Sequence, residues 1–110
     1  MMGQPLHNLD AELRHLVSND GAHIGVTDLK DASGLLFLCP KCGTHSILVW
    51  FQNAGVPDSL RPGPDRWQAT GTSIDDLSLT PSINLDTYPT HEGVKHACDW
   101  HGWVLNGRAS

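Results

Sequence analysis

Two short cysteine-containing motifs constrain this chain more than any other feature. The first is Cys39-Pro40-Lys41-Cys42-Gly43, and the second is Cys98-Asp99-Trp100-His101-Gly102. Each motif places two candidate metal ligands two residues apart and ends in glycine, which permits the positive φ of a tight turn. Three thiolates and one imidazole match the ligand number and type of a closed tetrahedral zinc site. The spacing therefore predicts one structural Zn²⁺ bound by Cys39, Cys42, Cys98 and His101.

Other arrangements of these ligands remain open. His45 lies three residues after Cys42, and His96 lies two residues before Cys98, so either can replace His101 or hydrogen-bond to a ligand. We expect both to stay outside the coordination shell. A redox dithiol normally precedes a helix, whereas an apolar strand-like segment follows Cys42. An iron–sulfur cluster usually needs four cysteines, and the chain has three.

Composition limits the class of protein. The 110 residues suit one domain, and abundant Gly and Pro favour a fold that a metal ion helps to hold together. A net charge of −5 with seven scattered Lys and Arg argues against nucleic-acid binding. The odd cysteine count, the absence of a signal sequence and the absence of a long apolar run indicate a cytoplasmic protein of a reducing compartment, with no membrane contact.

The pattern of apolar residues predicts a small mainly-β (α+β), zinc-ribbon-like domain with an N-terminal amphipathic helix. Leu6, Leu9, Leu13 and Leu16 have helical spacing, so we expect a helix over 6–17 within a helical arm over 1–22. Residues 23–110 are expected to form the β domain.

Within that domain, we expect a hairpin of residues 35–51 whose turn carries the first motif. Short strands are also expected at 24–26, within 74–85 and at 103–105. A Pro/Gly-rich loop covers 53–73, from which Trp67 is expected to fold back onto the core. Asn106-Gly107 is a hairpin signal, although few residues follow it. The expected core contains Leu36, Leu38, Ile47, Val49, Leu77, Leu79, Ile83, Trp103 and Leu105.

The succession CPKCGTHSILVWF, RWQATGTSIDDLSLTPSINLD and CDWHGWVLNG resembles a family of short bacterial and phage proteins of the DUF6527 type. The resemblance implies phage or prophage origin and implies the same metal set of three cysteines and His101. It also implies a shared purpose for His45, Thr80-Pro81-Ser82-Ile83 and residues 102–107. Distant relatives are associated with operons for ubiquitin-like conjugation, which implies a peptidase as the alternative.

From these features we expect a zinc-stabilised, non-enzymatic protein-binding or assembly module. A virion component or a host-factor binder would fit, in the host cytoplasm or in the virion. The partner is expected to be a protein that contacts the loop 53–73 and the helix 6–17, and a homo-oligomer or larger assembly is possible.

The alternative is a zinc-dependent hydrolase or peptidase with an open metal position. Asp75 or Asp76 would be the base, and Ser78, Thr80 or Ser82 would orient the substrate. The sequence contains neither H-E-x-x-H nor G-x-S-x-G. Whether the protein is an enzyme therefore stays open, and the balance of the residues favours a non-enzyme.

Overall fold

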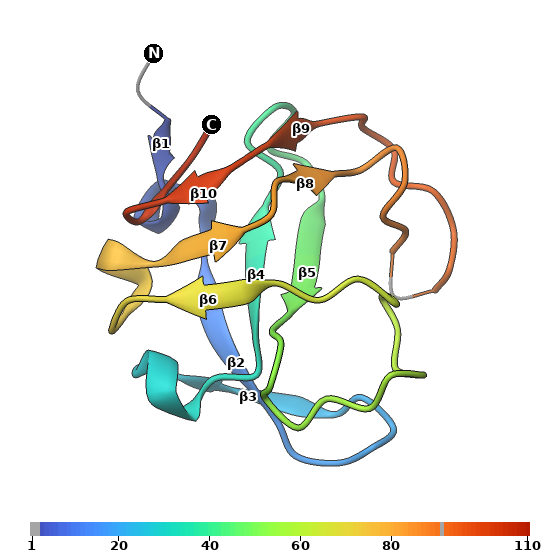
Figure 1. Cartoon of the computed structure of the whole chain (residues 1–110). Helices are drawn as coiled ribbons and strands as arrows, with labels where there is room; N and C mark the ends of the chain where they lie inside the picture. Colours follow the sequence, from blue (N-terminus) through green and yellow to red (C-terminus); the bar gives the residue numbers. More distant parts are fainter. Residues whose placement is uncertain (1–2, 91) are drawn as a thin grey trace.

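The chain folds into short strands joined by turns and 3₁₀ helices, as the computed structural model shows for residues 3–90 and 92–110 (Figure 1). The strands are β1 (Gln4–Pro5), β2 (Glu12–Leu16), β3 (His23–Val26), β4 (Gly34–Leu38), β5 (Ser46–Trp50), β6 (Gln68–Thr70), β7 (Ser78–Thr80), β8 (Ile83–Asn84), β9 (His101–Gly102), β10 (Val104–Leu105) and β11 (Arg108–Ala109). The 3₁₀ helices are η1 (Leu6–Leu9), η2 (Leu29–Asp31) and η3 (Ile74–Asp76). The expected small mainly-β domain is thus confirmed.

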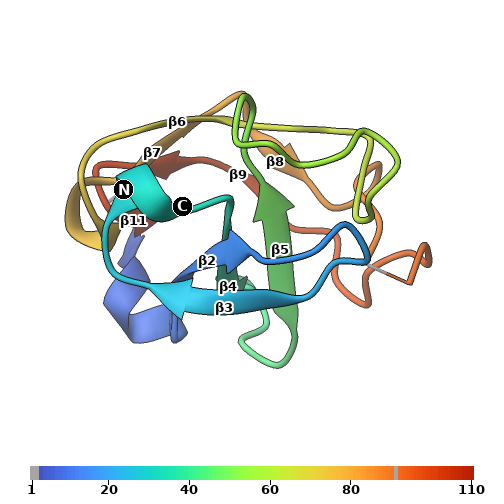
Figure 2. The same ribbon diagram turned by 90° about the horizontal axis from the view of Figure 1, so that it is seen from below.

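Four sheets make up two layers. The largest has the strand order β3-β2-β4-β5 and is antiparallel throughout. The smaller sheets are β1-β11-β10, β6-β7 and β8-β9. Figure 2 shows β6 to β9 on one side of the molecule and β2 to β4 on the other. The core fills the space between these layers, and its fully buried side chains include Leu13, Leu35, Phe37, Ile47, Val49, Leu77, Leu79, Ile83 and Leu85.

The predicted N-terminal amphipathic helix over 6–17 is wrong. Leu6 and Leu9 are buried by η1, and Asp10 then adopts a left-handed conformation (φ 50°) that ends the helix. The chain continues as β2, which lies between β3 and β4 in the large sheet. Backbone hydrogen bonds to two neighbouring strands replace those that a helix would make. Leu13 is buried in either arrangement, so its spacing from Leu6 and Leu9 did not distinguish them.

The predicted hairpin of residues 35–51 is confirmed, but the inward face of its first strand is shifted by one residue. Leu35 and Phe37 are buried, whereas Leu36 and Leu38 are only half-buried. Side chains alternate along a strand, so an all-apolar strand leaves its inward face undetermined by sequence.

Near the end of the chain, the inward face is again shifted by one residue from the predicted one. Trp103 and Leu105 are 44% and 48% exposed, while Trp100 and Val104 are buried. Asn106 and Gly107 both have positive φ and turn the chain into β11. Although few residues follow the turn, β11 pairs with both β10 and β1.

Trp67 packs into the core from the Pro/Gly-rich loop, as predicted, with 3% of its surface exposed. Its ring meets Tyr88 edge-on, with the ring centroids 4.8 Å apart. Within the described part of the chain, none of the helices has the length and hydropathy needed to cross a lipid bilayer.

Candidate functional site

Ser82 and His101 meet because of the pairing of β8 with β9. Asn84 lies opposite His101 in this two-stranded sheet, and Ser82 lies two residues before Asn84. Side chains two residues apart share a face of a strand, so His101 is the diagonal neighbour of Ser82. Ile83 and Gly102, which pair with each other, are buried. The side chains of Ser82, Asn84 and His101 therefore lie on the opposite, outward face.

The hydroxyl and imidazole of this pair are in hydrogen-bond contact. Ser82 Oγ lies 3.1 Å from His101 Nε2, with Ser82 half-buried and His101 exposed. The indole Nε1–H of Trp67 donates to the Ser82 carbonyl at 3.4 Å, which ties the serine backbone to the core. A hydroxyl hydrogen-bonded to an imidazole is the arrangement that activates a serine for attack on an acyl carbon.

A small cleft opens beside Ser82. Its volume is about 170 Å³, and it is lined by Asp65, Arg66, Trp67, Pro81, Ser82, Asn84, Thr87 and Tyr88. The Tyr88 hydroxyl donates to the Leu48 carbonyl at 2.7 Å, which fixes this wall of the cleft to β5. Because Ser82 lines a cleft, a ligand group has a place to lie beside its hydroxyl.

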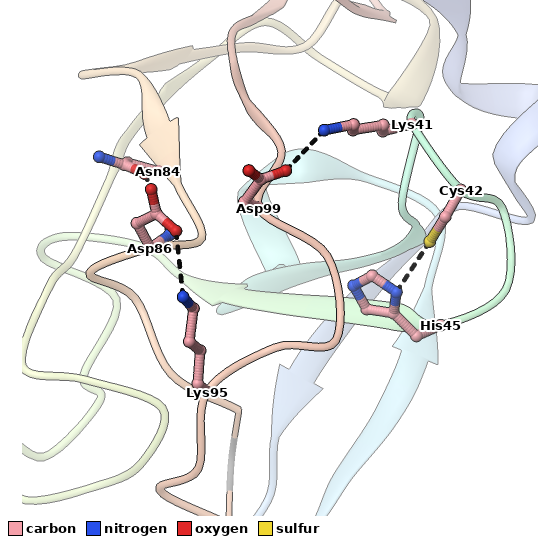
Figure 3. Close-up of polar contacts among 7 residues, drawn as sticks. All are labelled: Lys41, Cys42, His45, Asn84, Asp86, Lys95 and Asp99. Atoms are coloured by element: carbon pink, nitrogen blue, oxygen red, sulfur yellow. Dashed lines mark hydrogen bonds and ion pairs between the residues drawn. The ribbon is translucent and has the colours of Figure 1, made fainter.

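A second polar group lies in the turn between β4 and β5. The candidate ligand atoms of Cys39, Cys42 and His45 all lie within 4.8 Å of one another. Cys42 Sγ lies 3.0 Å from Nδ1 of His45, as Figure 3 shows. Backbone hydrogen bonds from Cys39 N to His45 O and from Gly43 N to Cys39 O close the turn. Two sulfur atoms and one nitrogen at this separation can bind a metal ion, and Zn²⁺ prefers this donor set.

The pKa values of the two thiols in this turn shift in opposite directions. Hydrogen bonds from Thr44, whose hydroxyl donates to Cys42 Sγ at 3.3 Å, lower the pKa of Cys42 to about 6. Burial raises the pKa of Cys39 to about 11. Hydrogen bonding thus favours the thiolate form of Cys42, whereas burial favours the protonated thiol of Cys39.

Two features join this turn to the second motif. Cys98 is half-buried and packs against the core cluster that contains Cys39. Lys41 Nζ lies 2.5 Å from Asp99 Oδ1, a contact that Figure 3 shows bridging the two segments. The structure thus groups Cys39 and Cys42 with His45 and places the segment that carries Cys98 beside their turn. It places the His101 imidazole on Ser82, and no observation here tests metal binding by His101, so that ligand set stays a prediction.

The other predicted site residues lie elsewhere. Asp75 pairs with His7, and Asp76 accepts hydrogen bonds from the backbone of Thr72 and Ser73 at the start of η3. The hydroxyl of Ser78 accepts a hydrogen bond from the Asn106 backbone. Thr80 is exposed at the end of β7. None of these side chains belongs to the Cys39, Cys42 and His45 group.

The Ser82–His101 pair was missed as a pair. Ser82 was named only as a residue that orients substrate, and His101 only as a metal ligand. The two residues are 19 positions apart in the sequence, and their contact depends on the β8–β9 register. No local sequence motif predicts that register. The sequence signal that was available is the Thr80-Pro81-Ser82-Ile83 stretch, whose shared purpose the family resemblance implied.

Comparison with known proteins identifies the family. No curated protein and no solved structure matches the chain. The family model that matches is BubE, the bacterial ubiquitination-like system serine protease. The assignment to the DUF6527-type phage zinc-binding family was therefore wrong, and phage origin and a non-enzymatic assembly role lose their support. Because the match covers residues 10–110, this chain belongs to the BubE family of serine proteases of bacterial ubiquitination-like systems.

Proposed function

We propose that the protein is a serine peptidase in which Ser82 is the nucleophile and His101 is the general base. The observation that supports this assignment is the 3.1 Å contact between Ser82 Oγ and His101 Nε2 beside a cleft. The family name supports the same reaction class.

The geometry suits a two-step acyl transfer. Ser82 Oγ attacks the substrate carbonyl carbon while His101 Nε2 takes the hydroxyl proton. Collapse of the tetrahedral intermediate breaks the bond to the leaving group, which receives that proton from His101. A water molecule, deprotonated by His101, then attacks the acyl-enzyme and releases the carboxylic acid, and the proton returns to Ser82.

Asn84 is the side-chain donor that the site offers for the developing oxyanion. It shares the outward face of β8 with Ser82 and lines the same cleft. Its Oδ1 accepts the backbone N–H of Asp86 at 3.0 Å, as Figure 3 shows, so the amide orientation is fixed and its N–H groups remain for a ligand. Such a donor stabilises the transition state more than the ground state.

The substrate that fits this proposal is an acyl bond made by a ubiquitin-like protein, as the family name suggests. This retains the expectation of a protein partner but makes that partner a substrate.

Substitution of the reacting pair tests the peptidase. Ser82→Ala and His101→Ala should each lower hydrolysis of an acyl substrate by several orders of magnitude and abolish covalent labelling by a fluorophosphonate. Ser59→Ala and His15→Ala, which change exposed residues outside the cleft, should retain wild-type rates. Labelling that persists in Ser82→Ala would place the nucleophile elsewhere.

Zn²⁺ is the structural cofactor in this proposal, bound at the Cys39, Cys42 and His45 group. The donor set supports it, as does the buried Nε2 of His45, which has no hydrogen-bond partner. With this ion, the two cysteine-bearing turns would form a ribbon-like site. Asp75 and Asp76 have other partners, so the hydrolytic chemistry is assigned to Ser82 and His101 without a metal-bound water.

A further inference from the structure

We propose that Cys98 and His45 complete a Cys₃His metal centre with Cys39 and Cys42, and that this centre holds the segment that carries His101 in place. The first half concerns metal binding alone, whereas the second rests on the proposed peptidase function.

Cys98 is the fourth donor on geometric grounds. Cys98 is half-buried and packs against the buried cluster that contains Cys39, a member of the three-residue group in the β4–β5 turn. The Lys41–Asp99 ion pair joins the residues that follow Cys39 and Cys98, which holds both turns side by side. A third thiol is thus carried by the segment that this ion pair holds beside the turn of Cys39 and Cys42.

His45 is a better imidazole donor than His101. Its Nδ1 lies 3.0 Å from Cys42 Sγ, and its Nε2 is buried without a partner. His101, in contrast, already contacts Ser82. With His45 as the ligand, His101 is free to act as a base.

His96 is the competing imidazole. Its ring centroid lies 5.1 Å from that of His45, and 6% of the residue is exposed. Neither of its ring nitrogens makes a hydrogen bond within the described part of the chain. We assign His96 to the packing around His45, because its ring contacts the His45 ring.

The path from the metal centre to the catalytic pair is short. Cys98 and His101 are three residues apart, and between them Trp100 is buried with its ring edge-on to Phe37 at 6.0 Å. The Trp100 carbonyl accepts the Leu85 N–H at 2.9 Å, directly after β8. The segment is therefore anchored at both ends, by the thiol turn and by β8. Loss of the Cys98 anchor would let His101 move relative to Ser82.

Cobalt substitution of the whole chain tests the ligand set. Co²⁺-loaded wild type should show thiolate charge-transfer absorption from three sulfur atoms, and Cys98→Ser should lose roughly a third of it. His45→Ala should weaken Co²⁺ binding by more than the roughly 10–100-fold that loss of an outer contact costs. His101→Ala and His96→Ala should bind Co²⁺ as tightly as wild type, or with an affinity lowered by no more than roughly 10–100-fold. Full charge-transfer intensity in Cys98→Ser, or a greater loss of affinity in His101→Ala or His96→Ala than in His45→Ala, would overturn the assignment.

Positioning is tested by comparing loaded wild type, chelator-stripped wild type and Cys98→Ser. Chelator-stripped wild type and Cys98→Ser should have a kcat lowered by up to roughly 10²-fold and a KM close to that of loaded wild type. Misplacement of a base affects the reaction more than it affects substrate binding. The His101 imidazole signals in NMR spectra, assigned by their loss in His101→Ala, should shift or broaden in the same samples. Lys95→Ala, which breaks the Asp86–Lys95 ion pair on the adjacent loop, is the matched control.

Where Cys98→Ser folds poorly, Asp99→Asn weakens the same anchor without touching a ligand and should show a smaller loss of kcat. Unchanged kcat and unchanged His101 signals after metal removal would refute the positioning role. An active Ser82→Ala would refute the peptidase assignment, while the cobalt result would still decide the ligand set.

Discussion

In the proposed mechanism, Asn84 gives the clearest test at a single residue, because it lies opposite His101 and two residues after Ser82. Asn84→Ala should lower kcat by about 10²–10³ with little change in KM, since an oxyanion donor acts in the transition state. Steady-state kinetics on an acyl substrate would measure both constants.

Thr87→Val is the matched control for Asn84→Ala. Thr87 lines the same cleft, and its hydroxyl donates to the Asn84 carbonyl at 3.3 Å. The Thr87→Val variant should keep a kcat close to that of the wild-type protein. Equal losses in the two variants would indicate a general disturbance of the cleft instead of a lost donor.

At the residue scale, the sequence predicted ligand types better than residue roles. The C-x2-C spacing singled out Cys39 and Cys42, and the β4–β5 turn does bring their sulfur atoms into one group with His45. C-x2-H suggested the same role for His101, which stays a prediction; in the structure, strand β9 begins at His101 and its imidazole contacts Ser82. His45 was expected outside the coordination shell, because its approach to the two thiols depends on how the turn closes, which the spacing does not encode.

At the element scale, the pairing of β4 with β5 leaves no room for a side chain at Gly34. A Cβ there would lie 2.5 Å from the Val49 carbonyl oxygen and 2.8 Å from the Trp50 ring. Gly34→Ala should therefore destabilise the fold by about 1–3 kcal/mol, as overpacking does. Thermal unfolding would show this as a fall in Tm of roughly 4–20 °C.

Gly25→Ala, on β3, provides the comparison for Gly34→Ala. Its Cβ would meet the ends of the flexible Arg14 and Glu12 side chains at 3.3 Å, which can move aside. We expect a Tm close to wild type. If Gly34→Ala has the same Tm as Gly25→Ala, the β4–β5 pair must adjust its spacing to accept the added methyl group.

The start of η3 makes stability depend on pH through Asp76. Hydrogen bonds from the Ser73 and Thr72 backbone N–H groups hold the pKa of Asp76 below its usual 3.8. A carboxylate with a lowered folded-state pKa stabilises the fold above its unfolded pKa, and this contribution is lost as pH falls through the folded value. Asp76→Ala should thus lower Tm at neutral pH, and the difference from wild type should shrink below about pH 3.8.

Asp58→Ala, an exposed carboxylate in the loop after β5, controls for the loss of one negative charge. A difference between Asp76→Ala and wild type that stays constant through the acid range would rule out the charge-dependent stabilisation.

Among the elements, local signals succeeded where they were unambiguous. Alternation and turn residues predicted β3, the β4–β5 hairpin and the Asn106-Gly107 turn. The helix over 6–17 failed because Leu6, Leu9 and Leu13 satisfy helical spacing in a 3₁₀ turn followed by a strand. Pairing of β2 between β3 and β4 is a long-range choice that spacing within β2 does not encode.

At the scale of the whole molecule, metal binding and folding should be coupled. A ligand present at a hundred times its Kd stabilises a fold by about 2.7 kcal/mol, so chelation should lower Tm by roughly 10–20 °C. Calorimetry of metal-loaded and chelator-treated protein, with re-addition of Zn²⁺, would measure the change and its reversal. A Tm that does not respond to chelation would contradict a structural ion.

The ladder between β8 and β9 contains only two residue pairs, and both reacting side chains depend on it. A slip of one residue would turn His101 from the outward face to the inward face while leaving most of the core unchanged. Specific activity would then be a stringent assay of correct folding: two preparations with indistinguishable circular dichroism could differ in the fraction of molecules that hydrolyse substrate, and titration of active sites would count the molecules with the native alignment.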